Sequence, residues 1–159
     1  MVKDSEDSLK SYKRRRDFSR TPEPEGRPGK TDKKRFVVHE HHARRLHWDL
    51  RLEVGGVLRS WAVPKGPPEK PGIRRLAVQT EDHPIDYIDF KGIIPEGNYG
   101  AGTVDIWDTG GFELVEEKRD KELKFILDGK RLNGTYYLLK IKGGKIPGDK
   151  NWLLFKAKE

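Results

Sequence analysis

Cysteine is absent from this chain of 159 residues. Its absence excludes a disulfide framework, a thiolate zinc site and a cysteine nucleophile, so histidine, carboxylate or backbone atoms must hold any metal. Long hydrophobic runs are absent too. No stretch approaches the roughly 18 apolar residues that a membrane span needs, and no apolar segment follows the basic start as it does in a secretion signal. We therefore expect a cytoplasmic protein with no membrane as a partner.

Apolar residues are scarce, at 33%, against 37% charged residues. Four tryptophans, five tyrosines and six phenylalanines still supply anchors for a folded core, and the length suits one domain. The formal net charge of +7 favours a polyanionic partner such as nucleic acid. The alternative is a charge surplus that serves only solubility.

The first 34 residues differ from the rest of the chain. They are strongly basic, contain a Pro- and Gly-rich stretch over 21–29, and have only a few scattered apolar side chains. These cannot form a core, so we expect residues 1–34 to be a partly disordered, charged N-terminal arm with a helical turn around 9–16. Residues 35–159 then form the folded domain.

From residue 35 onward, short alternating polar and apolar runs predict β-strands. We expect these strands at 35–40, 46–54, 57–63, 74–80, 103–108, 112–116, 123–128, 134–141 and 151–157. Turn signals separate the runs, among them Gly110-Gly111 and the glycine-rich segment 95–102, which lacks the lysine and hydroxyl residue of a phosphate-binding P-loop. Many short strands with little helical periodicity are typical of an all-β barrel or sandwich.

The most informative segment is 39–53, where four of the five histidines fall within nine residues. In a strand, alternate side chains share a face. One face of the predicted strand is apolar, and the other carries four polar side chains, those of His47, Asp49, Arg51 and Glu53. The polar face is therefore either open to solvent or lines a wet cavity.

His47 and Asp49 can share one metal ion if the strand twists or the two side chains lean together, with a third ligand from a neighbouring strand. His39 and His41 share a face of that neighbouring strand, and His42 points the other way, so the identity of the third ligand stays open. Imidazole and carboxylate ligands without sulfur suit manganese, zinc or iron. The alternative is a set of solvated polar side chains without a metal.

Arg51 lies on the same face as these candidate ligands. Its charge would repel a metal ion unless an anion lay between them, and a phosphate satisfies both charges. His83 follows a predicted strand, where an imidazole can act as a general acid or donate to a phosphate oxygen. A salt bridge of Arg51 to Asp49 or Glu53, and a turn histidine without function, are the alternatives. No serine elbow or paired carboxylates are visible, so an enzyme here would carry out metal-assisted hydrolysis.

Five segments carry the strongest signals in the chain. They are KRRRDFSRTPEP at 13–24, FVVHEHHARRLHWDLRLE at 36–53, SWAVPKGP at 60–67, EDHPIDY at 81–87 and PEGNYGAGT at 95–103. In this order they closely resemble the 3′-phosphoesterase module of bacterial ligase D proteins, over nearly the whole chain. The resemblance implies an all-β fold, a small closed β-barrel of short antiparallel strands with the site in a groove.

The resemblance also implies a reaction and a set of site residues. The family uses a divalent metal, preferably manganese with cobalt or zinc as substitutes, to remove a 3′-terminal ribonucleoside and then the 3′-phosphate left behind. The implied metal ligands are His41, His47 and Asp49, and the six-residue step from His41 to His47 fits the family pattern, although His39 or His42 could replace His41. Arg51 and His83 would contact the scissile phosphate. The other implied catalytic positions are Asp17, Glu23 and Glu81, and the other implied substrate contacts are Arg16, Lys65, Arg75 and Tyr87.

The partners follow from the same resemblance. The substrate would be the 3′ end of a DNA or RNA-terminated primer-template, and part of residues 12–24 would fold over the groove. Because no counterpart of the polymerase and ligase modules is present, we expect a stand-alone monomer that works with separate polymerase and ligase proteins. The competing hypothesis is a non-catalytic nucleic-acid-binding barrel with a structural metal site, whose coordination would be filled by protein ligands. Arg51 beside the ligands favours catalysis.

Overall fold

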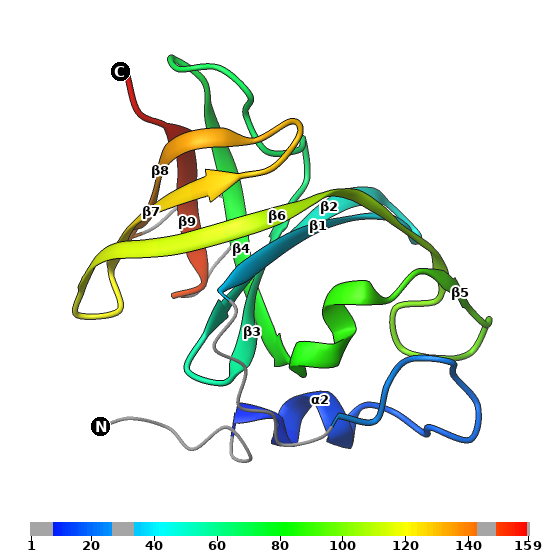
Figure 1. The fold of residues 1–159 in the computed structure, drawn as a ribbon. Helices are drawn as coiled ribbons and strands as arrows, with labels where there is room; N and C mark the ends of the chain where they lie inside the picture. Colours follow the sequence, from blue (N-terminus) through cyan, green and yellow to red (C-terminus); the bar gives the residue numbers. More distant parts are fainter. Residues whose placement is uncertain (1–7, 27–33, 143–148, 159) are drawn as a thin grey trace.

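The computed structural model describes residues 8–26, 34–142 and 149–158. Within these ranges two short helices accompany the strands, the α-helix α2 (Lys10–Arg14) and the 3-10 helix η1 (Ile85–Asp89). The strands are β1 (Arg35–His42), β2 (Leu46–Val54), β3 (Val57–Val63), β4 (Arg74–His83), β5 (Gly92–Ile94), β6 (Gly102–Lys118), β7 (Glu122–Asp128), β8 (Asn133–Lys140) and β9 (Asn151–Lys156) (Figure 1). None of the helices in the described ranges is long and apolar enough to cross a membrane.

The strands form a closed antiparallel barrel. Their order is β1-β2-β3-β4-β9-β8-β7-β6, and β1 pairs again with β6, so eight strands close the ring. The short strand β5 pairs with the first residues of β6 and lies outside this ring. Closure removes the exposed edges of an open sheet. The predicted all-β class and closed barrel are confirmed.

The predicted break at Gly110-Gly111 is wrong. The structure has one long strand there, β6, which pairs with β1 along its first part and with β7 along its second. A side chain at Gly110 would collide with the backbone carbonyl of Asp128, so the glycine permits a close approach of two strands rather than a turn. The segment from 85 to 94, for which no element was predicted, contains η1 and β5.

The main hydrophobic core fills the interior of the barrel. On β2 the even-numbered residues point inward, and Leu50 and Leu52 are fully buried there. Trp61 and Trp152 meet edge to face at the centre, with ring centroids 5.7 Å apart. The apolar alternation of the strands thus produces the inner face of the barrel wall.

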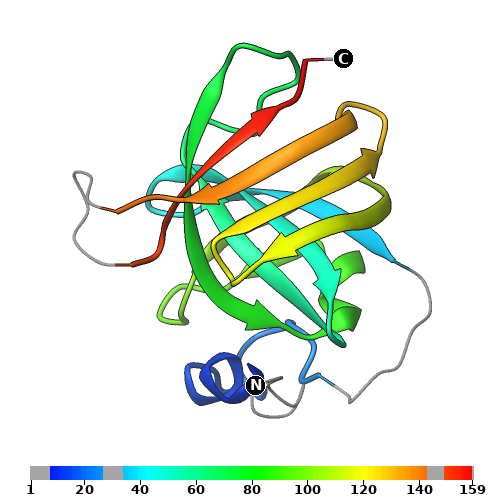
Figure 2. The ribbon, with the colours of Figure 1, turned by 90° about the vertical axis from the view of Figure 1, so that its left-hand side faces the viewer.

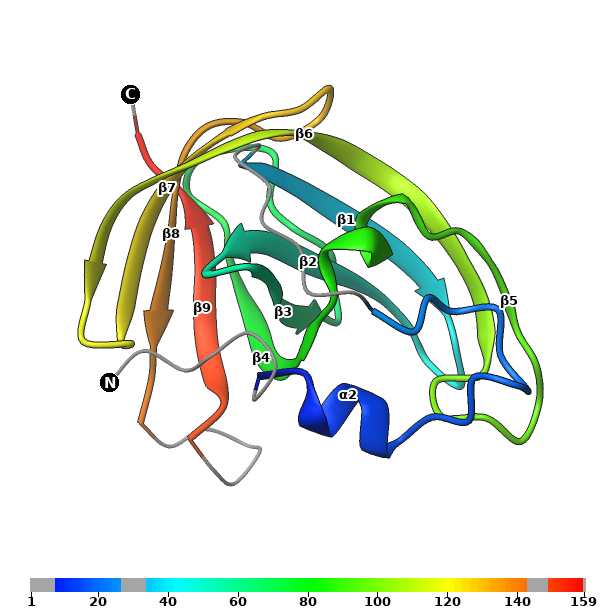
Figure 3. The same ribbon diagram turned by 60° about the horizontal axis from the view of Figure 1, so that its bottom comes forward.

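A second hydrophobic cluster lies on the outside of the wall formed by β1 to β3. Here η1 lies across the strands and α2 lies beside it, next to β4 (Figure 3), and Tyr12 and Tyr87 pack against Val37 and Leu58. Tyr12 and Phe18 of the arm therefore add to this outer cluster and need no core of their own. As a result, the outward row of β2 lies in a covered groove and not on an open surface.

Candidate active site

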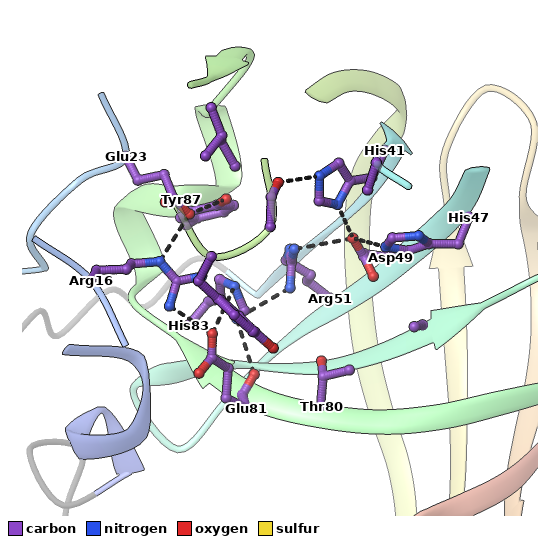
Figure 4. A pocket seen from close by; sticks show the side chains of 15 residues that line it. Arg16, Glu23, His41, His47, Asp49, Arg51, Thr80, Glu81, His83 and Tyr87 are labelled. Carbon is purple, nitrogen blue, oxygen red and sulfur yellow. Dashed lines mark hydrogen bonds and ion pairs between the residues drawn. The ribbon is translucent and has the colours of Figure 1, made fainter. Parts of the chain in front are cut away.

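The polar row of β2 lines a pocket of about 210 Å³ on the outside of the barrel (Figure 4). Asp49 and Arg51 are only 5% and 4% exposed, and His47 is half-buried. Strand β1 lies alongside, with His39 opposite Asp49 and His41 opposite His47. In both strands these side chains point outward, because the apolar residues that alternate with them point into the barrel interior.

His41, His47 and Asp49 place one potential ligand atom each within 4.8 Å of one another. Asp49 Oδ2 lies 3.3 Å from His47 Nε2 and 3.6 Å from His41 Nδ1. The turn after β1 brings the two imidazoles together, with ring centroids 4.8 Å apart. The structure brings His41 to this cluster, whereas His42 is on the opposite face of β1, with its Nε2 3.8 Å from Glu40 Oε1.

The hydrogen bonds of the two imidazoles orient their lone pairs toward Asp49. His41 Nε2 lies 2.8 Å from the carbonyl oxygen of Gly100, and His47 Nδ1 lies 3.0 Å from that of Arg45. Each of these nitrogens must donate a hydrogen to its carbonyl, so in the uncharged ring the other nitrogen is an acceptor that faces the carboxylate, whereas a protonated ring donates from that nitrogen to Asp49. When both rings are uncharged, three electron-pair donors meet with no hydrogen between them. This donor set fits a divalent metal ion.

The electrostatics of the cluster also favour a cation. Burial raises the pKa of Asp49, but the Arg51 guanidinium and the two imidazoles outweigh burial and hold that pKa far below its ordinary value. Burial lowers the pKa of His47, but the hydrogen bond and charge of Asp49 outweigh it and raise the pKa overall. The carboxylate is therefore ionised and attracts positive charge to the ring nitrogens.

Arg51 is held in place by four neighbouring side chains. Its Nε donates to His39 Nδ1 at 3.1 Å, its Nη1 donates to Ser60 Oγ at 2.9 Å, and its Nη2 lies 3.4 Å from Asp49 Oδ2. His83 Nδ1 lies 3.2 Å from Nη1 and 3.0 Å from the carbonyl oxygen of Glu81. A guanidinium fixed in this way is preorganised for an anion.

The two histidines beside Arg51 are uncharged near neutral pH. Burial, followed by the charge of Arg51, lowers the pKa of His39 to about 3. Burial, Arg51 and Arg16 lower the pKa of His83 well below its ordinary value. Positive charge on this side of the pocket therefore comes from the two arginines.

Arg16 and Glu23 of the N-terminal arm form the rim of the pocket across from the His41, His47 and Asp49 cluster. Arg16 pairs with Glu23 at 3.0 Å and with Glu81 at 2.6 Å, and its side chain is 5% exposed. Tyr87, on η1, donates its hydroxyl hydrogen to Glu23 at 2.7 Å. These contacts connect the arm to β4 and to η1, as Figure 4 shows.

Comparison with known proteins agrees with this geometry. The family described as the DNA ligase D 3′-phosphoesterase domain matches residues 39–140. The chain belongs to this family. It is 48% identical over 159 residues to the multifunctional non-homologous end joining protein LigD of Pseudomonas aeruginosa, covering 95% of this chain and 19% of that protein. The resemblance found in the sequence is thus confirmed.

Two further relatives give the same picture. The LigD protein of Mycolicibacterium smegmatis is 47% identical, with 96% of this chain and 21% of the relative covered. That of Mycobacterium tuberculosis, described as a multifunctional non-homologous end joining DNA repair protein, is 45% identical, with 96% and 20% covered. The chain therefore spans about a fifth of the length of these LigD relatives.

The structure brings together most of the residues that the ligase D resemblance implied. Nine of the twelve line this pocket, and they are Arg16, Glu23, His41, His47, Asp49, Arg51, Glu81, His83 and Tyr87. The other three lie elsewhere. Asp17 is exposed and accepts hydrogen bonds from Ser19. Lys65 is exposed on the loop after β3, and Arg75 is on the face of β4 that carries the buried Ala77.

Three parts of this pocket were missed in the sequence analysis. Ser60 was one polar residue in a strand, and only its pairing with Arg51 across β2 and β3 reveals its role. Gly100 acts through its backbone carbonyl, which no side-chain pattern can show. Tyr99 lines the mouth at 49% exposure and accepts a hydrogen bond from Arg15 at 3.1 Å. An aromatic side chain in a glycine-rich loop was the available signal for Tyr99.

Proposed function

We propose that this protein is a manganese-dependent 3′-end-healing phosphoesterase. It would remove 3′-terminal ribonucleosides and 3′-phosphates from DNA or RNA-terminated primer strands and leave a 3′-hydroxyl for ligation. The observation that carries the proposal is the convergence of His41, His47 and Asp49 next to the fixed guanidinium of Arg51. A metal site and an anion site that share one wall suit a phosphate better than any neutral group.

The proposed metal ligands are His41, His47 and Asp49. When bound there, a divalent ion supplies Lewis acidity toward phosphate oxygens and makes water more acidic. Manganese is the proposed ion, and cobalt or zinc would also suit the imidazole and carboxylate donors. The carbonyls of Gly100 and Arg45 keep both imidazoles in the tautomer that such an ion requires.

Arg51 is the proposed phosphate-binding residue. Its hydrogen bonds to His39 and Ser60 fix the guanidinium plane before substrate arrives, so little reorganisation accompanies the reaction. His83 lies beside it. In the tautomer in which His83 Nδ1 accepts from Arg51 Nη1, Nε2 carries the hydrogen and would donate it to another oxygen of the same phosphate. The two side chains would share the negative charge that develops as the phosphorus–oxygen bond breaks.

The part of the pocket formed by the N-terminal arm would recognise the 3′ end of the nucleic-acid strand. Glu23 accepts from Arg16 and Tyr87, and Glu81 accepts from Arg16, so the guanidinium of Arg16 is held at the pocket by two carboxylates. We propose that this arrangement positions a terminal 3′-phosphate during the monoesterase step. Asp17 and Lys65 would then act from outside the pocket, on the arm and on the loop after β3. Arg75 faces the barrel interior with Ala77, so it would act only through the position of β4.

The biological role follows from the relatives. Their names describe multifunctional proteins of non-homologous end joining. We propose that this chain prepares 3′ ends for separate polymerase and ligase activities in the same kind of repair, and that it acts as a monomer on a primer-template.

The deciding experiment is a 3′-phosphate release assay on a primer-template. We expect phosphate release with manganese, none after exhaustive chelation, and none from Asp49→Asn, which keeps the side-chain shape but removes the charge. The matched control is Asp105→Asn, an exposed carboxylate on β6. Wild-type turnover in chelator would refute the metal-dependent reaction. A metal that binds tightly to a protein without turnover would favour the non-catalytic nucleic-acid-binding barrel.

A further inference from the structure

A row of aromatic and basic side chains crosses the barrel face formed by β7, β8, β9 and β4. Directly paired positions place Lys124 beside Tyr137, Tyr137 beside Phe155, and Phe155 beside Arg74. Figure 2 shows these strands in front, with no helix of the described residues across them. We call these four residues the aromatic row.

The aromatic row is ordered and partly exposed. The Tyr137 and Phe155 rings are stacked, with centroids 5.4 Å apart and planes 19° apart. The Arg74 guanidinium lies 5.6 Å from the Phe155 centroid, and the Lys124 ammonium lies 5.8 Å from that of Tyr137. Both rings remain half-buried even though the barrel core is on the other side of the sheet. Packing of the core therefore does not explain them.

A hollow beside this row carries charge of one sign. Its lining includes both rings together with Arg74, Lys156 and Lys158, and among the residues that the structure describes it includes no carboxylate. Exposed aromatic faces bordered only by cations are suited to nucleic acid, because bases stack on the rings while phosphates meet the positive charges. An apolar protein surface would match the rings but would leave three cations without partners.

We propose that the aromatic row and its hollow bind a single-stranded segment of nucleic acid. This inference rests on the proposed function for the identity of that segment, which is the 3′-terminal stretch of the primer strand, unpaired from its template over the few nucleotides between the pocket and the hollow. The hollow shares no lining residue with the pocket, so it is a second contact surface on the same substrate.

Strand β4 connects the two places. Its register with β3 and β9 is regular from Arg74 to Thr80, so Arg74, Leu76, Val78 and Thr80 face the same outer side. Arg74 lines the hollow, and Thr80 lines the pocket. Six residue steps at about 3.3 Å each separate them by about 20 Å, a span that a few nucleotides of an extended strand can cover. The outward side of β4 thus provides a path from the 3′ end to the aromatic row.

The test compares the binding of long and short oligonucleotides by fluorescence anisotropy, in chelator so that no turnover occurs. The probes are single-stranded DNA of twelve and of three nucleotides, each with a 3′-phosphate. The variants are Tyr137→Leu with Phe155→Leu, which keeps apolar bulk but removes the rings, and Arg74→Gln. The charge control is Lys118→Gln, because Lys118 lies between Glu116 and Glu122 on the β6–β7 hairpin.

We expect the double variant to bind the long strand about tenfold more weakly or worse, since stacking on each ring is lost. Arg74→Gln should weaken it less, Lys118→Gln should leave it unchanged, and all variants should bind the short strand like the wild type. Unchanged long-strand binding by the double variant, or equal losses on both strands, would overturn the proposal. So would a wild-type dimer that the double variant converts to a monomer with unchanged DNA affinity. If the aromatic row passes this test and the manganese assay shows no phosphate release, the proposed function alone fails.

Discussion

Arg51 connects two parts of the pocket, because its guanidinium lies between the cluster of His41, His47 and Asp49 and the buried histidines His39 and His83. It contacts Asp49 on one side and His39, Ser60 and His83 on the other. A planar group with several fixed donors can satisfy these neighbours and still present a hydrogen-bonding edge. Neither its charge alone nor its length alone would do this.

We predict that Arg51→Ala lowers the rate of 3′-phosphate release by roughly 100-fold or more, as the loss of one preorganised donor does elsewhere. Arg51→Lys should recover only part of the rate, since an ammonium keeps the charge but cannot reproduce the donor geometry. Single-turnover rates at saturating primer-template measure both. Full recovery by lysine would show that only the charge matters. Arg44→Lys, in the exposed turn after β1, provides the matched control.

His83 is predicted to bind phosphate rather than to act as the general acid. Burial and two arginines lower its pKa, so the free protein holds an uncharged imidazole near neutral pH. An uncharged ring is a poor acid for an alkoxide leaving group. We therefore expect His83→Ala to slow hydrolysis of a natural 3′ end and of a nucleoside 3′-(4-nitrophenyl phosphate) by similar factors.

The second substrate decides between the roles, because nitrophenolate leaves without a proton. A loss confined to the natural 3′ end would contradict the prediction and identify His83 as the acid. Equal, wild-type rates on both substrates would mean that His83 has no part in the reaction.

At the scale of the elements, the alternation in the sequence predicted what lies inside the barrel. The β2 and β3 ranges agree with the structure, because Leu50, Leu52 and Trp61 must face the core. Alternation also separated His47, Asp49 and Arg51 onto one face. It could not show that this face is covered, since the cover comes from η1 and the arm, which are distant in sequence.

The amino-acid composition of the N-terminal arm did not predict how its residues pack against the barrel. Its charge and few apolar residues predicted partial disorder with a helical turn around 9–16. That turn is α2, and Tyr12 is fully buried in the outer cluster, while residues 1–7 and 27–33 of the arm lie outside the described ranges. A segment that packs against the apolar outer surface of a barrel needs only a few apolar side chains of its own. Long-range ion pairs such as Arg16 with Glu81 leave no local sequence signal either.

We predict that deleting residues 1–24 strongly lowers the rate of 3′-phosphate release, whereas the remaining barrel still unfolds cooperatively. The deletion removes Arg16 and Glu23 from the pocket, while the barrel interior keeps its own separate core. Phosphate release and thermal unfolding should be measured together, with Arg14→Gln on the exposed side of the arm as the control. Wild-type release by the shortened chain would show that the arm is dispensable, and loss of cooperative unfolding would show that the barrel depends on it.

At the scale of the whole molecule, the barrel wall is buried on both sides where the site lies. Val38 belongs to the interior cluster and Val37 to the outer one, and the polar row of β2 lies on the covered outer side. Charged groups in such a place are costly unless they are paired or neutral. The carboxylates are paired with arginines, and the buried histidines beside Arg51 are neutral, so folding and protonation are linked.

This linkage predicts that stability falls as the pH drops below about 6.5, the ordinary pKa of histidine. His83 has a lowered pKa in the folded protein, so below that pH the unfolded chain binds a proton that the folded protein does not. Its contribution is therefore fully present above about pH 6.5 and decreases by about 1 kcal/mol per pH unit below it. His39 acts in the same direction, whereas the raised pKa of His47 opposes both.

Urea unfolding in chelator, between pH 7.5 and pH 5, measures the effect. His83 faces Arg51, Arg16 and the carbonyl of Glu81, and replacing it with glutamine keeps a polar group among them without a titrating one. We expect His83→Gln to reduce the slope of unfolding free energy against pH by about one proton, whatever its effect on stability at pH 7.5. His42→Gln, on the exposed end of β1, is the matched control. An unchanged slope in His83→Gln would mean that His83 already carries its proton in the folded protein, and the case for phosphate binding by a neutral imidazole would fall with it.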